Sequence, residues 1–191
     1  MTTKISIKKI SFTQIASFFI FCDLITIEYF QSPEYTFFQY ICLMPAIIYC
    51  FKYCRLIFRS SKIYILISLL LSSSFIVSSY VNRVASYNIR GSIFFGTFVL
   101  VLLIFLLIVG QSGKVDLFLK SGRIYLFIIL LINDLLMIIK PDQFYNINDI
   151  NIGTCFLGNK FNVAYAHLMF LFISVILQKQ KKLETLKSFF I

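Results

Sequence analysis

Six long apolar runs, separated by charged or polar residues, take up most of this chain. They cover residues 10–30, 36–51, 63–81, 92–110, 124–139 and 163–177. Runs of roughly 20 apolar residues match the hydrocarbon core of a bilayer, where a helix satisfies its own backbone polar groups in the absence of water. The sequence therefore predicts an all-α, polytopic membrane bundle of about six transmembrane helices, forming a single domain over residues 1–191.

The composition excludes several classes of protein. Hydrophobic residues make up 59% of the chain, charged residues only 14%, and the mean hydropathy is +0.87, far above the values of soluble domains. The net charge of +10 lies between the apolar runs and forms no basic face with interleaved aromatic residues, so we expect no nucleic acid partner. The five cysteines and the single histidine lack metal-ligand spacing, so we expect no metal and no cofactor.

The lysines and arginines predict the orientation. Segments 1–9, 52–62, 114–123 and 179–187 hold 14 of the 18 basic residues. Basic residues accumulate in cytoplasmic loops, which places both termini inside the cell. No small-x-small cleavage site follows the first lysines, so the run 10–30 is expected to remain as a first span. We expect a multi-pass protein of the bacterial cytoplasmic (inner) membrane with membrane lipids as partners.

Two carboxylates and one asparagine lie near the middle of apolar runs. Asp23 lies near the middle of the first run, and Asn133 and Asp134 lie near the middle of the fifth. Polar groups are costly in hydrocarbon and must pair, neutralise or face water. Two interpretations stay open: hydrogen bonds between helices, or a polar cavity lined by these residues.

Basic residues on the expected outer side are rare and therefore informative. Arg83 and Arg90 can clamp a phosphate through two parallel hydrogen bonds, or can reach lipid headgroups. His167, the only histidine, lies near the outer end of the sixth run. It is either a packed, hydrogen-bonded histidine or a catalytic one, and no residue near it in sequence forms a nucleophile–base pair with it.

The long outer loop predicted at residues 141–162 carries the most specific pattern. Its asparagines and aromatic residues suit sugar hydroxyls and rings, or simply turns. It ends in Gly158-Asn159-Lys160-Phe161 and Asn162, and Val-Ala-Tyr-Ala-His-Leu follows at residues 163–168. A glycine permits a tight turn, Asn159 can cap the following helix, and Lys160 offers a cation at the membrane surface.

The stretch from Gly158 to Leu168 resembles the loop-into-helix pattern of Wzy-type polysaccharide polymerases and the related O-antigen ligases. The resemblance implies glycosyl transfer between undecaprenyl-pyrophosphate-linked repeat units in capsule, exopolysaccharide or O-antigen assembly, with Arg83, Arg90, Asn159, Lys160 and His167 as substrate-binding candidates. Lipid-linked oligosaccharide and other polysaccharide-assembly proteins are the implied partners. No catalytic residue of the family can be assigned.

Those polymerases are roughly twice as long, so the chain resembles their first half. Their large outer loop, with its key Arg and His residues, has no match in residues 1–191, and the sequence predicts a truncated or partial polymerase-like protein. The alternative is a complete six-span transporter subunit or assembly factor without catalysis, in which Asp23 and Asp134 relay protons or ions.

Overall fold

A computed structural model describes residues 10–25, 33–58, 62–81, 89–141 and 154–189. These residues are helical apart from one short hairpin, and the helix content agrees with the predicted all-α class. The elements are α1 (Phe12–Leu24), α2 (Pro33–Lys52), α3 (Cys54–Phe58), α4 (Lys62–Val81), α5 (Ile89–Gln111), α6 (Val115–Ile139), β1 (Thr154–Cys155), β2 (Gly158–Asn159) and α8 (Lys160–Phe189).

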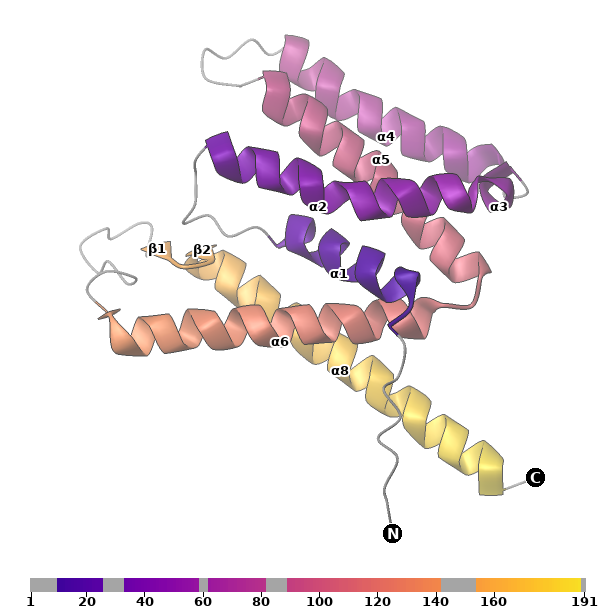
Figure 1. Cartoon of the computed structure of the whole chain (residues 1–191), viewed down its shortest axis with the longest axis vertical. Coiled ribbons are helices and arrows are strands. Elements are labelled where there is room, and N and C mark those ends of the chain that lie inside the picture. The colour runs from indigo at the N-terminus through magenta and orange to yellow at the C-terminus, as the bar shows by residue number, and fades with distance from the viewer. Residues whose placement is uncertain (1–9, 26–32, 59–61, 82–88, 142–153, 190–191) are drawn as a thin grey trace.

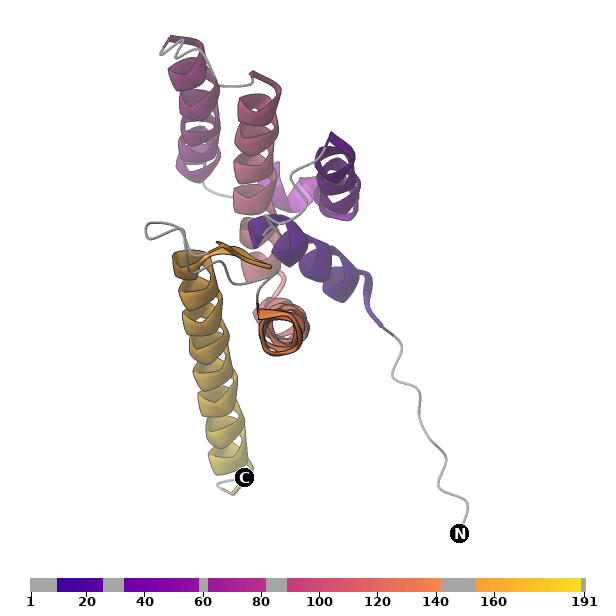
Figure 2. The same ribbon diagram turned by 90° about the vertical axis from the view of Figure 1, so that its left-hand side faces the viewer.

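The long helices form a chain of pairwise contacts in the order α4, α5, α2, α1, α6, α8 (Figure 1). Helices α4 and α5 pair along their length at one side of the bundle, and α1 lies between α2 and α6. Helix α8 crosses α6 obliquely and continues past it, as Figures 1 and 2 both show. The two ends of α6 therefore have different surroundings.

Local signals in the sequence set two of the helix ends. Ser11 caps α1, because its hydroxyl accepts a hydrogen bond from the Gln14 backbone while the Gln14 side chain accepts one from the Ser11 backbone at 2.9 Å. Gly113 adopts φ +66° just after α5 ends, a left-handed conformation that glycine enters without steric cost. The turn after α5 is consequently tight, and α6 begins at Val115.

Small residues allow the helices to approach closely. Ala16 of α1 and Ala46 of α2 are fully buried in a cluster with the large rings of Tyr49 and Phe105. Gly122 of α6 lies directly against the ring of Phe21 on α1. Between α4 and α5, the Ser72 hydroxyl donates to the carbonyl of Gly96 at 2.6 Å. Such contacts replace the hydrophobic effect as the source of helix association where the solvent is lipid.

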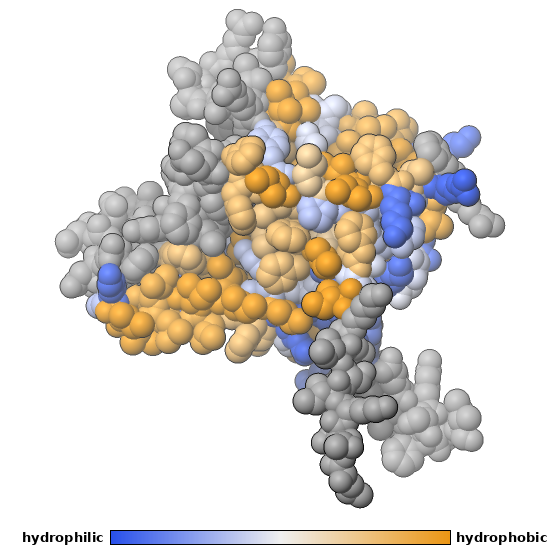
Figure 3. Space-filling view, in the orientation of Figure 1, coloured by the Kyte–Doolittle hydropathy of each residue, from blue (hydrophilic) through white to orange (hydrophobic). Residues whose placement is uncertain are grey.

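Three helices are long and apolar enough to cross a membrane, over Ile93–Gln111, Val115–Ile139 and Phe161–Gln180. Apolar stretches of 12–24, 37–52 and 62–78 in α1, α2 and α4 are shorter. Large apolar side chains remain exposed on the outside of the bundle, Ile138 and Phe172 among them. Figure 3 shows hydrophobic residues over much of one face, with hydrophilic residues near the end where α2 passes into α3. The chain thus has the character of a membrane protein.

The helices differ from the apolar runs in several places. Helix α6 begins at Val115, nine residues before the predicted run 124–139, so Lys120 and Arg123 lie on the helix rather than in a loop. Helix α8 extends from Lys160 to Phe189, well beyond the run 163–177. Charged residues are good helix formers, and for this reason they end an apolar run without ending a helix. Neither α3 nor the β1–β2 hairpin was predicted.

Candidate functional site

The β1–β2 hairpin lies between the C-terminal end of α6 and the first turns of α8. Its strands pair Thr154 with Asn159 and Cys155 with Gly158, so the tight turn falls at Phe156 and Leu157. Leu157 is fully buried in a cluster with residues of both helices. An apolar hairpin tip thus fixes where the Gly158–Phe161 segment meets α8.

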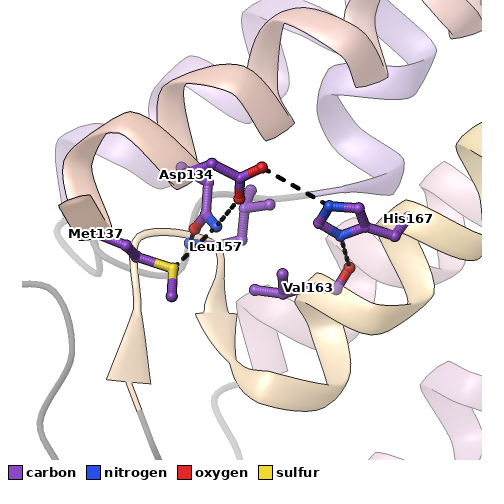
Figure 4. Close-up of polar contacts among 6 residues, drawn as sticks. Asp134, Met137, Leu157, Val163 and His167 are labelled. Carbon is purple, nitrogen blue, oxygen red and sulfur yellow. Dashed lines mark hydrogen bonds and ion pairs between the residues drawn. The ribbon is translucent and has the colours of Figure 1, made fainter.

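Asn133 attaches this hairpin to α6. Its side chain is fully buried, and its Oδ1 accepts a hydrogen bond from the Leu157 backbone N–H at 3.3 Å. Its Nδ2 donates to Oδ1 of Asp134 at 3.2 Å and contacts Sδ of Met137 at 3.3 Å (Figure 4). The amide therefore satisfies a buried backbone N–H and orients the neighbouring carboxylate at the same time.

Asp134 and His167 face each other across the α6–α8 contact. With Oδ1 of Asp134 held by Asn133, Oδ2 points toward the imidazole of His167, and the distance from Oδ2 to Nε2 is 3.8 Å (Figure 4). The two side chains are 51% and 45% exposed, so a third molecule can reach them. The separation is too long for a direct hydrogen bond but suits an ion pair or a bridging hydroxyl.

The backbone of α8 determines the role of each His167 nitrogen. Nδ1 lies 2.9 Å from the carbonyl oxygen of Val163, and a carbonyl can only accept, so Nδ1 must carry a hydrogen. In the neutral ring Nε2 is then the acceptor, and in the charged ring it donates toward Asp134. His167 can therefore take a proton at Nε2 beside a carboxylate that stabilises the resulting imidazolium.

The structure brings three of the substrate-binding candidates predicted from sequence to the junction that also holds Asn133 and Asp134. Asn159 ends β2, Lys160 begins α8, and His167 follows about 10 Å further along the same helix. Arg90 is the second residue of α5, which starts beside α4 and away from the hairpin (Figure 1). The Arg83 position and the side chains of Arg90, Asn159 and Lys160 fall outside the described part of the structure.

Asp23 belongs to a different helix interface. It is the next-to-last residue of α1 rather than mid-helix, is 6% exposed, and faces Cys42 of α2. Neither of its carboxylate oxygens has a hydrogen-bond partner. Within the described residues no hydrogen bond or ion pair links Asp23 to Asp134.

Sequence reasoning missed the pairing of Asp134 with His167. The signal was their symmetric placement: Asp134 lies five residues before the end of α6, and His167 seven residues after the start of α8. When two neighbouring helices run antiparallel, a residue near the end of the first lies at about the same depth in the bundle as a residue near the start of the second.

No three metal-ligating side chains come together in the described ranges. Comparison with family models, curated proteins and solved structures gives no match.

Proposed function

We propose that this chain is a polysaccharide polymerase-like protein of a bacterial cytoplasmic membrane, which acts on undecaprenyl-pyrophosphate-linked repeat units at the outer surface. The observation that carries the proposal is the convergence of Asp134 and His167 beside the hairpin that leads into α8. The segment that resembles the polymerases thus lies next to the described pair best suited to proton transfer.

The chemistry follows from the geometry of the pair. An acceptor sugar hydroxyl between His167 and Asp134 gives its proton to Nε2 as its oxygen attacks the anomeric carbon of the donor sugar. The bond from that carbon to the pyrophosphate breaks, and the lipid-linked pyrophosphate leaves with the electron pair. Asp134 stabilises the imidazolium that forms, and Lys160, which begins the same helix as His167, is the sequence-predicted cation that we assign to the leaving group.

We also propose that α1, α2, α4, α5, α6 and α8 all cross the membrane, with both termini inside. Lys52 Nζ lies 5.8 Å from the ring centres of both Phe12 and Tyr53, and Lys114 Nζ lies 4.9 Å from that of Tyr53. The start of α1, the end of α2 and the α5–α6 turn therefore meet at one end of the bundle. All three were predicted to lie inside from their lysines, and their meeting supports this orientation.

The test is complementation of a deletion of this gene in its own host. His167→Gln removes the proton acceptor, and we expect surface polysaccharide of long chain length to fall by about 10²-fold, as for loss of a general base. Asp134→Asn should give a smaller loss. Leu135→Ala, on the exposed side of the same helix, is the matched control and should complement fully. Chain length is read on gels at equal protein levels, and full complementation by His167→Gln would exclude the proposal.

A second candidate function, proton-coupled transport without bond formation, is favoured by the unpartnered carboxylate of Asp23. It makes the opposite prediction. Asp23→Asn would then abolish export of the substrate while His167→Gln left it intact, with Ser73→Ala as a control on the exposed face of α4.

A further inference from the structure

A second polar feature lies at the other end of α6 from the hairpin. A cavity of about 320 Å³ opens between the first turns of α6 and the middle of α8. It shares no residue with the Asp134–His167 pair. Its polar lining consists of Asp116, Lys120, Arg123, Ser174, Gln178 and Gln180.

The charge balance of the cavity favours an anion. Lys120 Nζ lies 3.4 Å from Oδ2 of Asp116, so these two charges offset each other. Arg123 is exposed and forms no ion pair with any side chain that the structure describes. One positive charge is left over, on a guanidinium whose planar donors match two oxygens of a phosphate.

Two buried polar atoms of the same cavity lack partners. Oγ of Ser174 and Oε1 of Gln180 are inaccessible and form no hydrogen bond. Buried polar atoms are normally paired, and an unpaired one is costly. Once its side chain turns toward the cavity, a serine hydroxyl can donate to a phosphate oxygen, and the Gln180 carbonyl oxygen can in the same way accept from a hydroxyl next to that phosphate. The lining therefore suits a phosphate that carries a hydrogen-bond donor.

The position of the cavity relative to the apolar stretches indicates where that phosphate comes from. The apolar stretch of α8 ends at Gln180, and that of α6 begins at Val115. The cavity thus lies at one boundary of the candidate spans, at the level of lipid headgroups. Helix α8 continues beyond α6 there (Figure 1), with Lys179 just before Gln180 and Lys181 and Lys182 just after it.

We propose that this cavity binds the phosphate of an anionic membrane lipid, with Arg123 as the principal cation and Ser174 as a second donor. Phosphatidylglycerol, whose headgroup carries hydroxyls beside the phosphate, is the probe. A free phosphate ion shares the same chemistry and is tested separately.

The experiment uses the purified full-length chain in neutral micelles, titrated with dioctanoyl-phosphatidylglycerol and followed by native mass spectrometry and thermal unfolding. We expect saturable binding that raises the unfolding temperature. Arg123→Gln should weaken binding about tenfold, as for loss of one charge-assisted contact, while Arg123→Lys should weaken it less. Ser174→Ala, which changes no charge, should weaken binding a few-fold.

Lys140→Gln is the matched control, since it removes an exposed charge at the opposite end of α6. Equal weakening by Lys140→Gln and Arg123→Gln would mean general charge attraction and would overturn the proposal, as would unchanged binding in both Arg123→Gln and Ser174→Ala. In another outcome, inorganic phosphate raises the unfolding temperature of the wild type but not of Arg123→Gln, while the lipid gives no rise. That result would exclude a membrane lipid as the source of the phosphate. Dioctanoyl-phosphatidylcholine should bind weakly and without dependence on Arg123.

Discussion

Asn133 is fully buried, yet both polar atoms of its amide are paired. One atom holds the hairpin backbone and the other holds Asp134, so this residue sets the geometry of the pair without itself offering a proton-transfer group. Burying an amide is costly unless its hydrogen bonds are made, and here they are made to groups that need positioning. Asn133 is a positioning residue, and its loss should affect the hairpin first.

Replacing Asn133 by leucine tests that role. Asn133→Leu keeps the branching of the side chain but removes the acceptor of the buried Leu157 N–H, and we expect the free energy of unfolding to fall by about 1–3 kcal/mol. The measurement is denaturation in mixed micelles. Ser73→Ala removes an exposed hydroxyl bonded only to its own helix and should change stability little. A variant as stable as wild type would show that the hairpin is held by apolar contacts alone.

At the scale of elements, the packing of α1 on α6 depends on the absence of a side chain. A Cβ at Gly122 would meet the ring of Phe21, which is itself 2% exposed and packs against Phe118. Neither the ring nor the helix backbone can move without disturbing the cluster. The structure thus explains why α1 and α6 approach closely near Gly122.

Two glycine substitutions separate this packing effect from helix propensity. Gly122→Ala should destabilise the protein by about 1–3 kcal/mol, because the added methyl group overpacks the interface. Gly110→Ala meets nothing within 4 Å and, by propensity alone, should be neutral or slightly stabilising. Thermal unfolding of both variants in one detergent gives the comparison. Equal effects of the two substitutions would contradict the close contact with Phe21.

The sequence predicts some elements well and others poorly, for physical reasons. The run 92–110 nearly coincides with α5, because Gly113 and basic residues bound it at the helix ends. The run 124–139 is too short, because Lys120 and Arg123 end the apolar pattern while lying on the helix, where Asp116 and Lys120 form a stabilising pair four residues apart. The hairpin escapes prediction because its strands have only two residues each.

For the candidate site too, the sequence predicts some features and leaves others open. The sequence could single out Asp134 and His167, since ionisable residues are rare in apolar runs. It could not pair them, because their proximity depends on how α8 crosses α6 and on the buried hairpin between them (Figures 1 and 4).

Across the whole molecule, the proposed function requires opposite ends of the bundle to face opposite sides of a membrane. The lysines around Tyr53 lie at one end, and the hairpin with Asp134 and His167 lies at the other. Orientation by basic residues and catalysis at the outer surface are consistent only if these two ends are separated by the bilayer.

Cysteine labelling in intact cells tests this separation most directly. In a variant without the native cysteines, Lys140→Cys and Arg55→Cys introduce single exposed thiols at the two ends of the bundle. A membrane-impermeant maleimide should label Lys140→Cys in intact cells and Arg55→Cys only after the membrane is permeabilised. The reverse pattern, or labelling of both in intact cells, would contradict the account.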